Sequence, residues 1–217
     1  MSQTLAALPA SPMNVAVLMF DNVEVLDFAG PFEVFGVSGG RDNKRLYDVF
    51  TVAQHSKPVL ARNNMSINCD YTFETMPHAH VFVIPGGFGT RREKHSPSML
   101  SFVRERVEAA HSVVSVCSGA LLLAKAGLLK DLHATSHRGA LDELALDEPS
   151  CKVHRQARVV DNGKIVTSAG IGMGIDASLY SVAKHFGLAQ AQETARYMEY
   201  DWHYQTVDGE KIILAKA

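Results

Sequence analysis

The sequence predicts an α/β domain built on an open β-sheet. Three short apolar runs, rich in β-branched residues, have the composition of fully buried strands: residues 14–20, 80–84 and 113–116. Each run is followed by a turn and then by a segment of helical composition. A chain of 217 residues with a hydrophobic fraction of 47% is long enough to bury one large core.

The remaining elements follow in chain order from turn signals and periodicity. Ser96-Pro97 opens a helix, and the turn at Asp161-Asn162-Gly163 predicts a hairpin within residues 151–168. The charged residues 91–94 are typical of a solvated loop or, less simply, of a site for an anionic substrate. We further expect strands at 48–53, 65–69 and 133–137. Helices are expected at 32–37, 118–126, 139–146, 175–186 and 189–200. On the helix that starts after Ser96, the buried face should consist of Leu100, Val103, Val107 and Ala110.

Composition narrows the function classes. A formal net charge of −2 gives no electrostatic argument for binding nucleic acid or an anionic membrane. Three cysteines form neither a disulfide framework nor a metal-ligand spacing, which favours the reducing cytoplasm. No apolar run approaches the length of a membrane span. We expect residues 1–13 to be a loose extension without signal-peptide character and residues 14–217 to form a single domain.

Cys117 stands where a buried strand meets a helix. Such a turn lifts a side chain out of the sheet, and the free N–H groups and positive dipole end of the helix stabilise a thiolate. The small residues Ser118 and Gly119 leave the thiol unhindered. The sequence therefore predicts a nucleophile whose pKa lies below the value of about 8.5 for a free cysteine. The alternative is a buried cysteine that acts as a small hydrophobic residue.

Further candidates are expected at the carboxyl edge of the sheet, where open α/β sheets place their ligands. Asp27 follows the first strand and is either a site residue or a helix N-cap. The Gly86-Gly87 pair either allows backbone N–H groups to approach a developing oxyanion or forms an ordinary tight turn. His137 ends a short strand and is either a general acid/base or a hydrogen-bonded structural residue.

No motif predicts a cofactor or a metal. Gly170, Gly172 and Gly174 lie between a strand and a helix, but their spacing and late position differ from those of a dinucleotide-binding loop. His78 and His80 lack a third ligand at a suitable spacing. We therefore expect chemistry that uses neither a metal nor an organic cofactor.

Several motifs in the same order resemble the ThiJ/PfpI superfamily over residues 14–202. They are Leu26-Asp27-Phe28-Ala29-Gly30-Pro31, Pro85-Gly86-Gly87, Val116-Cys117-Ser118-Gly119, Ala126-Gly127-Leu128-Leu129, Ala134-Thr135-Ser136-His137, Ser168-Ala169-Gly170, Gly174-Ile175-Asp176 and Met198-Glu199-Tyr200-Asp201-Trp202. The resemblance implies a doubly wound, mostly parallel sheet flanked by helices, which is the flavodoxin-like fold of the class I glutamine amidotransferases, with a nucleophile elbow. The form of the first motif is most similar to isonitrile hydratases and to the amidotransferase-like sensor domains of AraC-type regulators.

The resemblance also implies roles for individual residues. Cys117 is then the nucleophile, Asp27 the general acid/base beside it, and Ser118 a catalytic neighbour, while the Gly86-Gly87 backbone, His137 and Gly170 surround the substrate. The implied reaction is hydration of a small isonitrile to an N-substituted formamide by a hydro-lyase that is a homodimer. Isonitrile hydratases usually carry Thr where this chain has Ser118.

Two other functions remain open. One is a non-catalytic sensor whose Cys117 responds to oxidants or ligands; about fifteen residues follow Trp202, so we do not expect a DNA-binding domain in cis. The other is a glyoxalase- or deglycase-like stress enzyme, an activity that normally goes with Glu at the position of Asp27.

Overall fold

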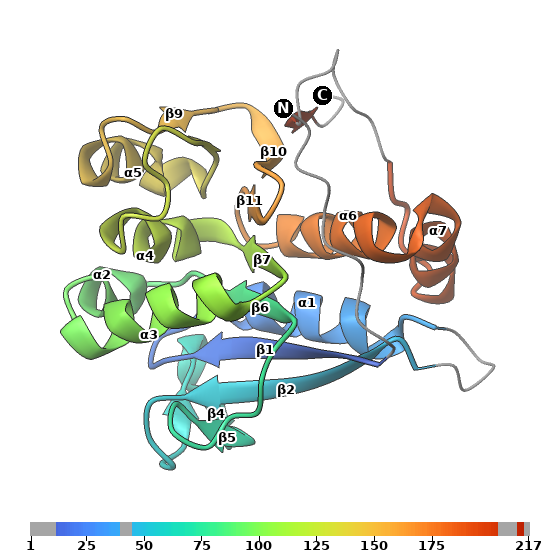
Figure 1. Ribbon diagram of the computed structural model, residues 1–217, viewed down its shortest axis with the longest axis horizontal. Coiled ribbons are helices and arrows are strands. Elements are labelled where there is room, and N and C mark those ends of the chain that lie inside the picture. The colour runs from blue at the N-terminus through green and yellow to red at the C-terminus, as the bar shows by residue number, and fades with distance from the viewer. Residues whose placement is uncertain (1–11, 40–44, 204–211, 215–217) are drawn as a thin grey trace.

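The computed structural model describes residues 12–39 and 45–203 and the backbone of residues 212–214. Its centre is an eight-stranded sheet in the order β12-β10-β11-β7-β6-β1-β2-β5 (Figure 1). The strands are β1 (Met13–Met19), β2 (Tyr47–Ala53), β5 (Tyr71–Thr72), β6 (Val81–Ile84), β7 (Ser112–Ser115), β10 (Ala157–Asp161), β11 (Ile165–Ser168) and β12 (Ile212–Leu214). All pairs are parallel except β10 with β11 and β10 with β12, so the predicted mostly parallel, doubly wound sheet is confirmed.

Helices cover both sides of this sheet (Figure 1). One group packs together and consists of α1 (Val25–Val37), α6 (Met173–Phe186) and α7 (Leu188–Tyr197). The other consists of α2 (Thr90–Glu93), α3 (Pro97–Ala109), α4 (Ala120–Lys125) and α5 (Leu141–Asp147). Two small sheets, β3 (Val59–Leu60) with β4 (Ser66–Ile67) and β8 (His133–Ala134) with β9 (Lys152–Val153), lie beside the main one.

The core forms where the sequence is most apolar. Every residue of β6 and β7 is buried, as expected of strands covered by helices on both faces. The Ser96 hydroxyl accepts a hydrogen bond from the Met99 N–H, 3.3 Å away, with Pro97 in the first helical turn, so the predicted start of α3 is confirmed. Met99 and Phe102 are buried with Val103 and Val107, whereas Leu100 of the predicted stripe is only half-buried.

The predicted solvated loop at residues 91–94 is wrong. Residues 90–93 form the short helix α2, and Glu93 and Lys94 are both buried. The Lys94 ammonium lies 2.6 Å from Asp147 and 2.8 Å from Glu143 of α5. A buried ammonium is tolerated because two carboxylates face it, and the Lys94–Asp147 pair joins residues 53 positions apart in the chain.

Other boundaries also shift. The strand expected at 65–69 shortens to β4, and α1 starts at Val25, well before the predicted residue 32. Met13 already belongs to β1, while residues 1–11 of the predicted extension lie outside the described residues. The eighth strand, β12, comes from a stretch for which no element was predicted.

Candidate active site

Cys117 lies on a strained turn directly after β7. Its φ of 57° is in the left-handed region, which costs a residue with a Cβ roughly 1–2 kcal/mol. Two flanking motifs hold the turn: the Cys117 N–H donates to the Ala169 carbonyl at 3.0 Å, and the Ser136 hydroxyl donates to the Cys117 carbonyl at 2.8 Å. Gly119 fits because a Cβ there would lie 2.2 Å from the Ile84 carbonyl oxygen. This geometry is that of a nucleophile elbow.

The thiol pKa moves in the direction opposite to the sequence prediction. Burial and the negative charge of Asp27 raise the pKa of Cys117 to about 12, although the N–H groups of Ser118 and Ile171 hydrogen-bond to its sulfur and act against that rise. The helix dipole expected to lower the pKa is weak here, because Cys117 begins a three-residue 3₁₀ turn, Cys117–Gly119, and α4 has only six residues. The resting side chain is therefore a thiol.

Asp27 is the carboxyl group that interacts with that thiol. It lies in the first turn of α1 and is fully buried. Its Oδ2 accepts from the Gly86 N–H at 3.0 Å, and its Oδ1 has no hydrogen-bond partner among the described residues. Burial raises the pKa of Asp27 to about 7, although the bonds from Cys117 and Gly86 counteract this, and the nearby charge of Glu24 adds to the rise. The N-cap of α1 is Glu24, so Asp27 does not have the capping role that the sequence left open.

Gly86 and Gly87 bring the backbone against both candidate residues. A Cβ on Gly86 would lie 2.5 Å from the Ser118 nitrogen and 2.9 Å from Oδ2 of Asp27. Gly87 has a φ of 123°, which disfavours any residue with a Cβ. Their N–H groups are already engaged, Gly86 with Asp27 and Gly87 with the Ser118 hydroxyl at 3.0 Å. Neither N–H group is free in this structure, and the oxyanion role of the pair stays a prediction.

The Ser118 hydroxyl is likewise held by its neighbours. It accepts from the Gly87 N–H at 3.0 Å and from the Thr90 hydroxyl at 3.1 Å, and it donates to the Gly87 carbonyl at 3.1 Å. Ser118 is 2% exposed, so this network is shielded from water. In this arrangement Ser118 ties the elbow to the Gly86-Gly87 turn and to α2.

A cavity of about 270 Å³ is lined in part by Cys117. His137 lines it, with Nδ1 accepting from the Gly139 N–H at 3.1 Å. Gly170 backs the imidazole, since a Cβ there would lie 2.2 Å from Cδ2 of His137. The structure thus brings Cys117, Ser118, Gly87 and His137 to one cavity, with Asp27, Gly86 and Gly170 behind its wall.

Five residues at this cavity were not predicted as site residues from the sequence: Glu24, Phe88, Gly139, Ala140 and Ile171. Arg91 also lines it and belongs to the segment offered as a site for an anionic substrate. Phe88 is 64% exposed and carries the Arg62 guanidinium 4.3 Å from its ring centre, while Arg91 pairs with Glu143 at 2.9 Å. Ile171 acts through its backbone N–H, for which a side-chain pattern gives no signal.

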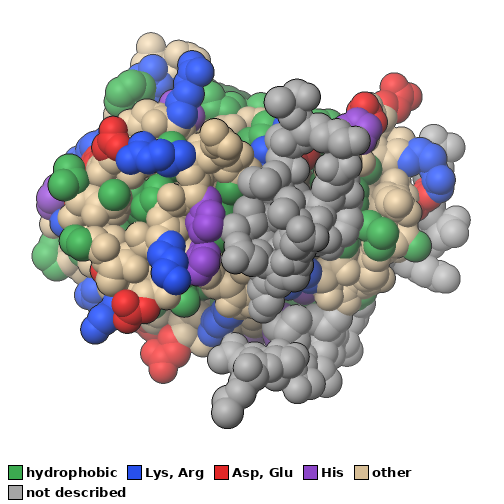
Figure 2. Space-filling model, turned by 90° about the horizontal axis from the view of Figure 1, so that it is seen from above, with side chains coloured by type: hydrophobic (Ala, Val, Ile, Leu, Met, Phe, Trp, Pro, Cys, Tyr) green, Lys and Arg blue, Asp and Glu red, His purple; other side chains and the backbone are tan. Residues whose placement is uncertain are grey.

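The described part of the chain holds no group of three or more His, Cys, Asp or Glu side chains arranged for a metal. None of its helices is long and apolar enough to span a membrane. On the described part of the face seen in Figure 2, acidic and basic side chains are interspersed, without the broad basic area that phosphate contacts need.

Together the fold and the site define a class of protein: a flavodoxin-like α/β domain with a cysteine at a nucleophile elbow, hydrogen-bonded to a buried carboxyl group. Residues 13–184 match the DJ-1/PfpI family, and the chain belongs to that family. The resemblance seen in the sequence is thereby confirmed.

Three similar proteins show the range of this family. An isonitrile hydratase of Pseudomonas putida is 31% identical over 87% of this chain and 78% of its own length. The HTH-type transcriptional regulator CdhR of Pseudomonas aeruginosa is 28% identical over 78% of this chain, which spans half of the regulator. A crystal structure of a ThiJ/PfpI family protein from Pseudomonas syringae has a TM-score of 0.79 at 30% identity, over 96% of this chain and 87% of the other.

Proposed function

We propose that this protein is a cysteine-dependent enzyme of the isonitrile hydratase type, a hydro-lyase that converts a small isonitrile and water into an N-substituted formamide. The observation that carries the proposal is the hydrogen-bonded pair of Asp27 and Cys117, with the pKa of the carboxyl group raised to about 7. Such a pair holds one shared proton near neutral pH and can both donate and accept it. The similarity to the hydratase of Pseudomonas putida supports the substrate class.

The first step uses that shared proton. The Cys117 thiol passes the pair's one proton to the Asp27 carboxylate, which delivers it to the terminal carbon of the isonitrile while the sulfur bonds to the same carbon; this leaves a thioimidate and an ionised carboxylate. The Ser118 and Ile171 N–H groups stabilise the developing thiolate. The raised thiol pKa fits this order, because sulfur becomes charged only as the proton moves to carbon.

The second step returns the pair to its starting state. The Asp27 carboxylate takes a proton from water, whose oxygen attacks the thioimidate carbon. The substrate nitrogen is protonated, the carbon–sulfur bond breaks, and the formamide leaves with the water oxygen on its carbon. One proton again remains between Asp27 and Cys117. No step requires a metal or an organic cofactor.

A turnover assay tests the proposal. The protein is incubated with a panel of small isonitriles and α-oxoaldehydes, and formamide or hydroxyacid products are measured by mass spectrometry. Isonitrile turnover with Cys117→Ala inactive supports the hydratase. Turnover of oxoaldehydes alone would instead favour the glyoxalase- or deglycase-like reading, despite Asp at position 27.

A sensor is the second candidate. The similarity to the regulator CdhR favours this function. The raised pKa of Cys117 keeps the resting thiol protonated, and oxidants attack the thiolate, so a ligand fits this site better than an oxidant as the signal. A sensor predicts no turnover on the whole panel.

The outer face of α1 supports the proposed homodimer. Val25, Ala29, Phe32 and Gly36 follow one another at helical spacing, and none is buried. An apolar stripe of this kind suits a second copy of the chain. Light scattering should give the mass of a dimer, and Phe32→Glu should give a monomer, whereas Leu188→Glu, at an exposed position of α7, should stay dimeric. A monomeric wild-type protein would contradict the proposed homodimer.

Three free thiols fit the expected cytoplasmic setting.

A further inference from the structure

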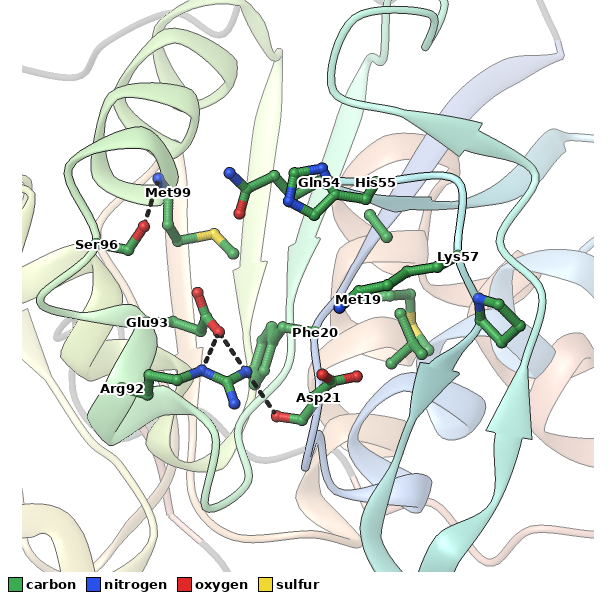
Figure 3. A pocket seen from close by; sticks show the side chains of 13 residues that line it. Met19, Phe20, Asp21, Gln54, His55, Lys57, Arg92, Glu93, Ser96 and Met99 are labelled. Carbon is green, nitrogen blue, oxygen red and sulfur yellow. Dashed lines mark hydrogen bonds and ion pairs between the residues drawn. The ribbon is translucent and has the colours of Figure 1, made fainter.

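A second cavity, of about 370 Å³, lies at the carboxyl ends of β1 and β2, against α2 and the start of α3 (Figure 3). It shares no lining residue with the cavity at Cys117. Nothing in the chemistry proposed for Cys117 uses it. Its shape and charges therefore need an explanation of their own.

The floor of this cavity is apolar and adaptable. Met19, Phe20, Val59 and Met99 are each no more than 5% exposed and line it from three different elements. Thioether side chains are flexible and polarisable, so they pack against apolar groups of different shape. The floor thus fits an aliphatic or aromatic body.

One wall carries a carboxylate with a free oxygen. The Glu93 side chain is only 9% exposed, and Arg92 donates twice to its Oε1, at 2.8 and 2.5 Å. Its other oxygen, Oε2, accepts none of the hydrogen bonds found among the described residues and is not fully buried. Figure 3 shows this carboxyl group directed into the cavity. An acceptor oxygen that lines a cavity and is not engaged by the protein is a place for a ligand donor.

The opposite wall carries an ammonium group. Lys57 extends into the cavity from the side facing Glu93 (Figure 3). No hydrogen bond or ion pair of Lys57 is found among the described residues, and the residue is exposed. A ligand with only a negative charge would be repelled by Glu93, and a ligand with only a positive charge would be repelled by Lys57. A ligand that carries both charges satisfies both walls.

We propose that this cavity binds a small zwitterion with an apolar body, such as an α-amino acid with an apolar side chain. Its ammonium group donates to Oε2 of Glu93, its carboxylate pairs with Lys57, and its side chain lies on Met19 and Met99. The site is separate from the reaction proposed at Cys117, so its occupancy does not depend on turnover.

Calorimetry on Cys117→Ala protein tests the ligand class without interference from the thiol. L-leucine and L-methionine should bind. N-acetyl-L-leucine lacks the cationic amine, L-leucinamide lacks the carboxylate and glycine lacks the apolar body, so each should bind at least tenfold more weakly. No binding of leucine and methionine, or equal binding of the blocked forms, would overturn the proposal.

Variants locate the binding. Lys57→Met should weaken leucine binding at least tenfold without loss of folding, because the side chain is exposed. Lys152→Met, at an exposed position on β9, is the matched control and should bind as the parent does. Glu93→Gln should also weaken binding, with melting curves used to verify its fold. Unchanged binding by Lys57→Met would place the ligand elsewhere and contradict the assignment.

Discussion

Two cavities at the carboxyl edge of one sheet use charge in opposite ways. At the elbow, Asp27, Cys117, Gly86, Gly87 and Ser118 hydrogen-bond to one another, so that almost every polar group has a partner within the protein. At the second cavity, Glu93 and Lys57 face each other without meeting. The first arrangement tunes a proton for chemistry, whereas the second leaves the Lys57 ammonium and one oxygen of the Arg92-paired Glu93 available to a ligand.

The largest expected effect comes from breaking the proton pair of the first cavity. Asp27→Asn keeps the shape and can still accept from Gly86, but it removes the titratable proton. We expect isonitrile turnover to fall on the order of a thousandfold, the usual range for losing a general acid/base. Cys117 should remain alkylatable, with its pH profile shifted to lower pH because the charge that raises its pKa is gone.

Asp131→Asn, at an exposed aspartate, is the matched control and should leave turnover and alkylation unchanged. Near-normal turnover of Asp27→Asn would end the proposed mechanism. An unshifted alkylation profile would remove the charge coupling between the two residues.

The same pair should make stability depend on pH. In the folded protein the pKa of Asp27 is about 7, against 3.8 as the ordinary value, so the folded state holds a proton that the unfolded state releases. Its contribution is fully present below about pH 4 and is lost as pH rises to about 7, a change of roughly 4 kcal/mol at about 1.4 kcal/mol per pH unit. Urea unfolding of wild type and Asp27→Asn from pH 4 to 8 measures it. Parallel curves for the two proteins would contradict the raised pKa.

A smaller effect is expected behind His137. In Gly170→Ala the new Cβ would meet the imidazole at 2.2 Å, so the ring must move, with a cost of roughly 1–3 kcal/mol. Gly172→Ala is the control, since nothing lies within 4 Å of a Cβ there. We expect a higher KM for Gly170→Ala and no change for Gly172→Ala. Equal kinetics of the two variants would show that the position of His137 does not matter for substrate.

The smallest effect should come from Ser118→Ala. The change leaves the Gly87 N–H without its acceptor and should cost about 1–2 kcal/mol of stability. Ser181→Ala, which removes only a bond to the preceding helical turn, should cost less. Thermal melting of both variants measures the difference. A Ser118→Ala protein as stable as Ser181→Ala would mean that this hydroxyl does not hold the turn.

The fold was predictable because its buried strands can be recognised from the local composition of the sequence. The runs at 14–20, 80–84 and 113–116 became β1, β6 and β7, each covered by helices on both faces. The helix α2 was missed because its polar composition does not reveal that Lys94 meets Asp147 across the fold. Local patterns carry no information about such partners.

The site was predictable only in part. Cys117 was placed by its strand-to-helix turn, and Asp27 was placed beside it by the family resemblance, not by spacing. The direction of the thiol pKa was wrong, because burial and the distant residue Asp27 outweigh a helix that is too short to help. The donor at Ile171 is a backbone N–H group, so the residue type at this position could not predict it.

The most direct test of the account is a titration of the Asp27 carboxyl group. Carbon-13 NMR of protein labelled at aspartate side chains, with Asp27→Asn used to assign the signal, reports its protonation in wild type and Cys117→Ala. The account predicts a pKa of about 7 in wild type, and at least as high in Cys117→Ala, since the bond from the thiol lowers it. A pKa near the ordinary value of about 3.9 would contradict the shared proton on which the proposed chemistry rests.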